Sequence, residues 1–141
     1  MRIGLLGASR VAAFAMIQPA KQLADVAIVA VASRDRTRAH DYAALHGIPR
    51  VHNRYESLVA DPDIDLVYIG TPPHAHCKHA MMAIEAGKPV LVEKPFSFDA
   101  GEASKVFAAA SLAGVHVFEA MHSPHHSLFR RVLAIIAEGR T

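Results

Sequence analysis

The stretch Val90-Leu91-Val92-Glu93-Lys94-Pro95 decides the fold class of this chain. Its apolar run does not alternate with polar residues, which is typical of a parallel strand that is covered on both faces. The run ends directly in a glutamate, a lysine and a proline. Because ligands bind at the carboxyl edge of open α/β sheets, this strand would deliver Lys94 to a binding site.

Other short apolar runs alternate with helix-like segments along the chain. The expected strands are residues 3–6, 27–32, 66–69, 90–92 and 115–119. The expected helices are residues 10–23 (broken or kinked at Pro19), 37–46, 55–60, 75–86, 100–113 and 128–138. This order predicts an α/β fold with a doubly wound, mostly parallel sheet.

Length and composition describe one ordinary globular domain. The chain has 141 residues, of which 52% are hydrophobic and 20% are charged, and no apolar run approaches the roughly 20 residues that span a bilayer. A formal net charge of +2 is too small to indicate a nucleic acid or a membrane as partner. Cys77 is the single cysteine, which excludes an internal disulfide and favours the cytoplasm as the compartment.

The first expected strand runs into a turn that carries part of a dinucleotide-binding fingerprint. The pattern G-x-G-x-x-G/A needs glycine at the turn, glycine where the backbone approaches a pyrophosphate, and a small third residue. Gly7 and Ala12 occupy the first and third places, whereas Ser9 occupies the second. Taken alone, the motif is equally compatible with an ordinary strand-to-helix turn. The expected pyrophosphate contacts are Gly7, Ala8, Ser9, Arg10 and Val11.

The end of the second expected strand indicates which dinucleotide would bind. An acidic residue at this place would accept hydrogen bonds from the ribose 2′-hydroxyl of NAD, but Ser33 and Arg34 stand there. A guanidinium suits a 2′-phosphate, so NADP is preferred over NAD, with Ser33, Arg34 and Arg38 as its contacts. The alternative is a solvated basic helix start.

Two prolines follow the strand at residues 66–69 and stiffen the next turn. Thr71, Pro72, Pro73 and His76 are therefore expected to line the nicotinamide side of the site. Histidines crowd this part of the chain and residues 116–126, but their spacing fits caps, pocket lining or surface better than metal ligands. No metal site is predicted.

Lys94 is the predicted catalytic residue. Desolvation beside an apolar strand end would push the pKa of its amine down and suit it to acid/base chemistry, while Glu93 nearby would counter that shift. Glu93 and Lys94 are also expected to lie against the cofactor. The alternative is a solvent-exposed lysine on the surface.

Taken in their order along the chain, these motifs resemble those of the Gfo/Idh/MocA oxidoreductase family. The pattern is nearest to the dihydrodiol dehydrogenase-like branch of that family. Ser9, and Pro124 at a place where that branch usually carries arginine, depart from the family pattern. The matching segments are Gly7-Ala8-Ser9-Arg10-Val11-Ala12, Val31-Ala32-Ser33-Arg34-Asp35, Asp63-Ile64-Asp65-Leu66-Val67-Tyr68-Ile69-Gly70-Thr71-Pro72, His76, Ala86-Gly87-Lys88-Pro89-Val90-Leu91-Val92-Glu93-Lys94-Pro95 and Glu119-Ala120.

The resemblance implies an NAD(P)-binding Rossmann domain, expected over residues 1–125. Residues 126–141 are expected to form a terminal helix that leads toward the family's C-terminal α/β domain, which is expected to be absent. The implied activity is hydride transfer between a nicotinamide and a hydroxyl or carbonyl carbon of a small-molecule substrate such as a sugar, cyclitol or dihydrodiol. The alternative is a non-catalytic NADP(H)-binding module or an inactive fragment.

An uncovered strand-end surface is expected to expose Phe96, Phe98 and Met121. Exposed apolar patches favour association, so self-association into a homo-oligomer is a further expectation.

Overall fold

The computed structural model describes residues 1–139; Arg140 and Thr141, the end of the expected segment 126–141, lie outside the described residues. Six parallel strands form one sheet in the order β3-β2-β1-β4-β5-β6. The chain starts at the centre of the sheet, fills one half, and then crosses to the other. The strands are β1 (Arg2–Leu6), β2 (Ala27–Ala32), β3 (Arg50–His52), β4 (Leu66–Ile69), β5 (Val90–Val92) and β6 (Val117–Glu119).

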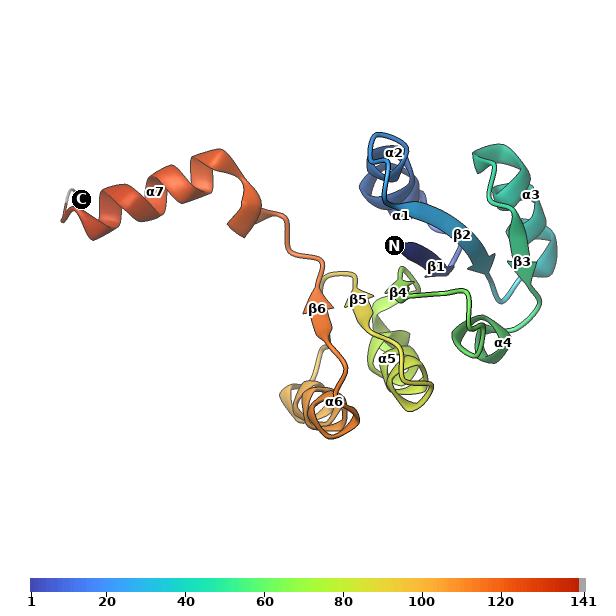
Figure 1. Ribbon diagram of the computed structural model, residues 1–141. Helices are drawn as coiled ribbons and strands as arrows, with labels where there is room; N and C mark the ends of the chain where they lie inside the picture. The colour runs from blue at the N-terminus through green and yellow to red at the C-terminus, as the bar shows by residue number, and fades with distance from the viewer. Residues whose placement is uncertain (140–141) are drawn as a thin grey trace.

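Helices cover both faces of the sheet, which makes the fold doubly wound as predicted (Figure 1). One face carries α1 (Arg10–Ala12), the π-helical turn η1 (Ala13–Ile17), α2 (Gln18–Ala20) and α3 (Arg36–His46). The other carries α4 (Tyr55–Val59), α5 (His76–Glu85) and α6 (Ala100–Ala113).

The central strands β1, β2 and β4 divide their side chains between two cores because successive residues point to opposite faces. Leu5 and Tyr68 pack with residues of the first helical layer, including Ala12 and Ala43. Their neighbours belong to the second core with α4, α5 and α6. Both faces of the central strands are therefore buried, which explains their continuous apolar sequence.

The sequence prediction is confirmed for three of the strands at every residue, and β1 begins one residue earlier than expected. It missed β3, because the strand is three residues long and Arg-Val-His carries only one apolar side chain. The last strand begins at Val117 rather than residue 115, since Val115 still belongs to the turn that ends α6 and donates to Ala110.

Pro19 neither breaks the first helical run nor leaves it regular. The run continues from residue 10 to residue 20, and the backbone N–H of Gln18 donates to the carbonyl of Ala13, a π-type bond. Proline at the start of α2 lacks an N–H, and the wider turn just before it accommodates that loss. The helical run ends at Ala20 instead of the expected residue 23.

Aspartates cap two of the crossover helices. Asp35 accepts from the backbone N–H of Arg38 at 3.1 Å, and Asp99 accepts from that of Glu102 at 2.8 Å. Each cap satisfies a donor that the first helical turn leaves free. The Asp35 cap fixes the start of α3 shortly after the end of β2, beside the predicted adenosine-binding residues.

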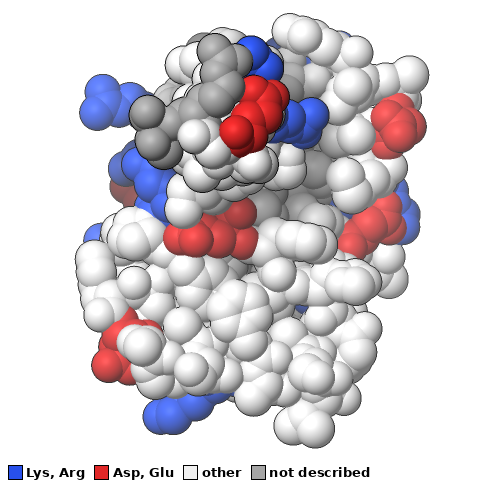
Figure 2. Space-filling view, turned by 90° about the vertical axis from the view of Figure 1, so that its left-hand side faces the viewer, with Lys and Arg blue, Asp and Glu red and all other residues white. Residues whose placement is uncertain are grey.

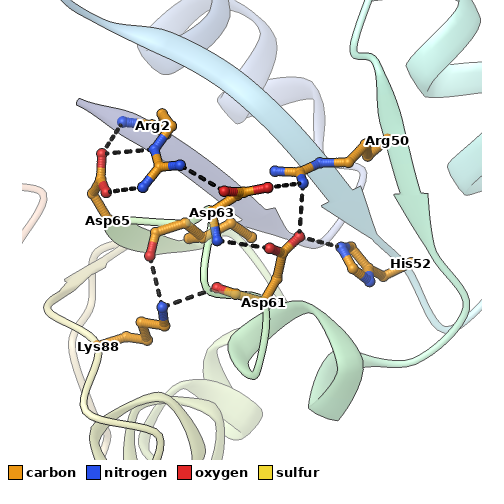
Figure 3. A network of polar contacts seen from close by, with 8 residues as sticks. Arg2, Arg50, His52, Asp61, Asp63, Asp65 and Lys88 are labelled. Atoms are coloured by element: carbon orange, nitrogen blue, oxygen red, sulfur yellow. Dashed lines mark hydrogen bonds and ion pairs between the residues drawn. The ribbon is translucent and has the colours of Figure 1, made fainter.

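An ion-pair network joins β1, β3 and the loop before β4 at the amino edge of the sheet (Figure 3). Arg2 contacts Asp63 and Asp65 at 2.8 Å each, and Arg50 contacts Asp63 at 2.9 Å. Lys88 donates to two backbone carbonyls of the same loop, those of Asp61 and Ile64. This network lies at the edge opposite the predicted binding site and is structural.

The last helix, α7 (Ser127–Ala137), extends away from the sheet (Figure 1). It follows the short 3-10 turn η3 (Ser123–His125), and its apolar residues Phe129, Val132, Leu133 and Ile136 are exposed by 39–56%. Figure 2 views the side that carries α6, β6 and α7 and shows charged residues widely spaced among uncharged ones.

Of the aromatic and methionine residues expected at this surface, Phe98 and Met121 are exposed, at 75% and 47%. The expectation was wrong for Phe96, which is 8% exposed because its ring stacks on Phe107 at 5.0 Å.

Candidate functional site

A cavity of about 770 Å³ opens at the carboxyl ends of β1, β2 and β4. This is where an open α/β sheet reverses its winding and where its ligands bind. Fifteen residues line it: Gly7, Ala8, Ser9, Ser33, Arg34, Asp35, Arg38, Tyr55, Gly70, Thr71, Pro72, His74, Ala75, Lys78 and His79.

Gly7 is required by the geometry of the turn at the cavity floor. Its φ of +102° lies where L side chains are disfavoured, and a Cβ there would come within 2.8 Å of the Gly70 carbonyl oxygen. The backbones after β1 and β4 can approach this closely only because Gly7 has no side chain. The glycine expected from the fingerprint thus has a clear steric reason.

Side chains of α3 hold the carbonyl groups of the turn. Arg38 donates to the carbonyl of Ala8 through Nη2 at 2.8 Å and Nε at 3.2 Å, and the Tyr42 hydroxyl donates to the carbonyl of Ser9 at 2.8 Å. Burial raises the pKa of Tyr42 to about 12, so its hydroxyl remains a donor. Since a trans peptide places C=O and N–H on opposite sides, the N–H groups of Ser9 and Arg10 point away from α3.

Ser9, which replaces the second glycine of the fingerprint, caps the helix. Its hydroxyl accepts from the backbone N–H of Ala12 at 3.1 Å. The same hydroxyl lies 2.9 Å from the position that a Cβ on Gly70 would take, so the turn and the end of β4 are closely packed.

The segment after β2 and the start of α4 meet at the other side of the cavity. The backbone N–H of Arg34 donates to the Tyr55 hydroxyl at 3.2 Å, and the Tyr55 ring packs edge-on against His79 with centroids 4.8 Å apart. The Arg34 side chain is exposed. Its guanidinium is therefore available at the cavity rim.

The turn after β4 is held by two buried histidines. His79 Nδ1 and Thr71 Oγ1 form a hydrogen bond of 2.9 Å, and burial lowers the pKa of His79, which favours its neutral form. His76 is 1% exposed and lies with Nε2 2.8 Å from the Thr71 carbonyl and Nδ1 2.9 Å from the Pro95 carbonyl. Pro73 begins the 3-10 turn η2 (Pro73–Ala75) and is exposed.

The Glu93-Lys94-Pro95 segment lies directly after β5. Glu93 is buried and accepts from the Tyr68 hydroxyl at 2.7 Å; burial and this contact raise the pKa of Tyr68. Lys94 is exposed, so the burial on which the sequence-based argument for its acidity depended is absent among residues 1–139. The Lys94–Pro95 peptide bond is cis.

The cavity brings together eight of the predicted site residues and leaves six outside its lining. Those inside are Gly7, Ala8, Ser9, Ser33, Arg34, Arg38, Thr71 and Pro72. Those outside are Arg10, Val11, Pro73, His76, Glu93 and Lys94.

Sequence reasoning did not assign several lining residues to the site. Lys78 and His79 lie in the first turn of α5, which follows His74 and the turn η2 at the cavity, and this proximity in sequence was the one available signal. Tyr55 follows a strand that was itself missed, so nothing in the sequence placed it here.

A second hollow of about 380 Å³ lies where η3 meets α7, and is lined by His122, Ser123, His126, Leu128, Phe129 and Val132. In the part of the chain that the structure describes, no three His, Cys, Asp or Glu side chains are grouped so as to hold a metal ion. Within residues 1–139, no helix has the length and apolar character needed to cross a membrane.

The fold and the cavity define a Rossmann-type nucleotide-binding domain. Residues 1–121 match the profile of the oxidoreductase family with an NAD-binding Rossmann fold. The chain belongs to this family, Gfo/Idh/MocA, and carries its NAD(P)-binding domain.

Similar proteins include enzymes of known reaction. The chain is 35% identical over 139 residues to an uncharacterized oxidoreductase of Rhizobium meliloti. It is 37% identical over 112 residues, 79% of its length, to trans-1,2-dihydrobenzene-1,2-diol dehydrogenase of Oryctolagus cuniculus. Its fold matches a 3-ketoreductase from Actinomadura kijaniata in complex with NADP and TDP-benzene, with a TM-score of 0.90 at 29% identity over 99% of this chain.

These relatives are longer than the chain. It spans 42% of the Rhizobium protein, 34% of the rabbit enzyme and 42% of the ketoreductase. The activity of a whole protein of this kind therefore belongs to the proposals below.

The cavity residues fit NAD(P). Gly7 and Ser9 line the cavity at the turn, where a helix N-terminus offers backbone N–H groups to an anion such as a pyrophosphate, and the carbonyls of Ala8 and Ser9 are held on the α3 side. Exposed cationic side chains lie at the rim near the end of β2.

Proposed function

We propose that this chain is the cofactor-binding part of an NADP-preferring oxidoreductase. In this proposal, Gly7, Ala8, Ser9, Arg10 and Val11 hold the pyrophosphate. Ser33 and Arg34 hold the adenosine 2′-phosphate, with Arg38 beside them. Thr71, Pro72, Pro73 and His76 form the nicotinamide side, and Glu93 and Lys94 complete it.

The observation that carries the NADP preference is the charge at the end of β2. Arg34, Arg38 and Lys78 line the cavity, whereas Asp35 is the single carboxylate among its described lining residues. Asp35 is already engaged as the cap of α3, so it is poorly placed to accept from a ribose hydroxyl. A dianionic 2′-phosphate therefore suits this rim better than a free hydroxyl does.

The two arginines have different roles in this proposal. Two nitrogens of Arg38 already bind the Ala8 carbonyl, so Arg38 chiefly supports the pyrophosphate turn. The Arg34 side chain is exposed and forms no hydrogen bond or ion pair with the described residues. Arg34 is thus the principal phosphate ligand.

We propose hydride transfer at a hydroxyl or carbonyl carbon of a sugar, cyclitol or dihydrodiol as the reaction. The bound nicotinamide supplies the hydride chemistry. Lys94 would give a proton to, or take one from, the substrate oxygen. Support for this proposal comes from the dihydrodiol dehydrogenases and the NADP-bound 3-ketoreductase among the similar proteins.

The test compares Arg34→Ala with Arg36→Ala in titrations with NADPH and NADH. Arg36 is an exposed arginine two residues away that does not line the cavity, so it is a matched control for the loss of charge. Arg34→Ala should weaken NADPH binding about tenfold and leave NADH binding nearly unchanged. An equal effect of both variants would contradict the assignment.

A second candidate is a module that binds NADP(H) without turnover. The specific observation in its favour is that Lys94 does not line the cavity. Assays of this chain and of a longer protein that contains it, with dihydrodiol and keto-sugar substrates, separate the two. Turnover that is lost on Lys94→Met supports the enzyme, whereas binding without any turnover supports the module.

The division at residue 125, the cytoplasmic location and a homo-oligomeric state stay predictions.

A further inference from the structure

The backbone around Lys94 is held by side chains from three elements. The N–H of Lys94 donates to Glu93 Oε2 at 3.2 Å. The carbonyl of Pro95 lies 2.9 Å from His76 Nδ1, and the N–H of Phe96 donates to Glu119 Oε1 at 2.8 Å. These groups come from the end of β5, the first residue of α5 and the last residue of β6.

Glu93 and His76 are themselves fixed by second contacts. The second carboxylate oxygen of Glu93 binds the buried Tyr68 hydroxyl, and the second ring nitrogen of His76 binds the Thr71 carbonyl. The Phe96 ring is buried against Phe107. The segment 94–96 is therefore tied to both neighbouring strands and to the turn after β4.

The Lys94 side chain has no such support. It is exposed and forms no hydrogen bond or ion pair with the described residues. A flexible lysine that carries out proton transfer needs a fixed point of attachment, because small displacements of a reacting group lower the rate strongly. The contacts above supply that fixed point, although neither His76 nor Glu119 lines the cavity.

We infer that Glu119 and His76 are positioning residues that set the place of Lys94 at the nicotinamide end of the site. This inference rests on the proposed function for the role of Lys94. Glu119 bridges the edge strand β6 to the Lys94 segment, while His76 bridges the same segment to Thr71 in the cavity wall.

Glu119 offers the sharper test because it is only partly buried. Glu119→Gln keeps an oxygen that can accept from the Phe96 N–H, whereas Glu119→Met keeps the size and removes the acceptor. Amide hydrogen exchange of Phe96 reports the contact itself. Two ligands report its effect: NADPH, and 2′-phospho-ADP-ribose, which has the same adenosine and pyrophosphate groups without the nicotinamide.

Slow exchange at Phe96 is expected in the unaltered chain and in Glu119→Gln, and fast exchange in Glu119→Met. The methionine variant should bind NADPH about fivefold more weakly, a change of about 1 kcal/mol, while 2′-phospho-ADP-ribose binds as before. Rescue by glutamine separates loss of the hydrogen bond from general disturbance of β6.

Equal exchange at Phe96 in all three proteins would overturn the contact. Equal losses for the two ligands, or no loss for NADPH, would overturn the positioning role. Failure of the proposed function is distinct, because it would appear in the unaltered chain as weak binding of both ligands.

Discussion

At the scale of single residues, the turn after β1 depends on the absence of a side chain at Gly7 and on two side chains of α3 that hold its carbonyl groups. Gly7 lacks the Cβ that would collide with the Gly70 carbonyl. Arg38 and Tyr42 bind the carbonyls of Ala8 and Ser9 from outside. The turn is therefore fixed before any ligand arrives, and its N–H groups need not reorganise on binding.

Replacing Gly7 with alanine should lower the free energy of unfolding by about 3 kcal/mol, since it adds backbone strain and a contact that cannot relax without moving β4. The matched control is Gly47→Ala. Gly47 has a φ of +72° with nothing within 4 Å of an added Cβ, so only the strain of about 1–2 kcal/mol applies. Urea unfolding of both variants checks this, and equal losses would show that the contact with Gly70 is unimportant.

Residue roles were harder to predict from sequence than residue positions. Gly7, Ser33 and Arg34 were placed at the site because strand ends are easily recognised and parallel strands share a carboxyl edge. The bonds of Arg38 to Ala8, and of His76 to Pro95, join residues 30 and 19 positions apart. Such contacts depend on tertiary packing, which no local pattern contains.

At the scale of elements, the sequence predicted the strands with apolar sequences and missed β3, whose sequence is mostly polar. β5 and β4 carry continuous apolar runs because both of their faces are covered. β3 lies at the edge of the sheet, pairs only with β2, and has intermediate exposure at all three residues. Its sequence Arg-Val-His contains a single apolar residue, so it carries no apolar run that could be recognised.

The ion pairs at the amino edge of the sheet should make the free energy of unfolding depend on pH in the acidic range. The hydrogen bond from Arg2 lowers the pKa of Asp65 to about 2. Because the pKa is depressed in the folded chain, Asp65 stabilises the fold above about pH 4, and this contribution is lost as the pH falls from about 4 toward 2. Asp65→Asn should therefore reduce stability at about pH 5 and leave it nearly unchanged at about pH 2.

The urea midpoint of Asp65→Asn at these two values of pH gives the measurement. Asp41→Asn is the control, since Asp41 is an exposed aspartate on α3 with no ion pair among the described residues. A loss of the same size at both values would exclude the ion pair with Arg2 as the cause.

At the scale of the whole molecule, the sheet and the helices on its two faces enclose two hydrophobic cores, and α7 belongs to neither of them (Figure 1). Phe129, Val132, Leu133 and Ile136 recur at helical spacing and form an exposed apolar stripe along α7. Stripes of this kind are normally covered by another surface.

The chain should therefore self-associate as its concentration rises. Leu133→Glu places a charge in the stripe and should shift the population toward monomer, whereas Arg131→Ala changes the net charge equally without adding polarity to the stripe. Sedimentation velocity at several concentrations distinguishes these variants. A chain that stays monomeric and binds no hydrophobic dye would contradict the prediction.

The cavity at the carboxyl edge is the other feature of the whole molecule, since it is assembled from the ends of β1, β2 and β4 together. The measurement that tests its assignment most directly is calorimetric titration of the unaltered chain with NADPH and NADH under the same conditions. We predict that NADPH binds at least about tenfold more tightly, owing to the cationic rim around Arg34. Equal affinities, or tighter binding of NADH, would contradict the account of this site.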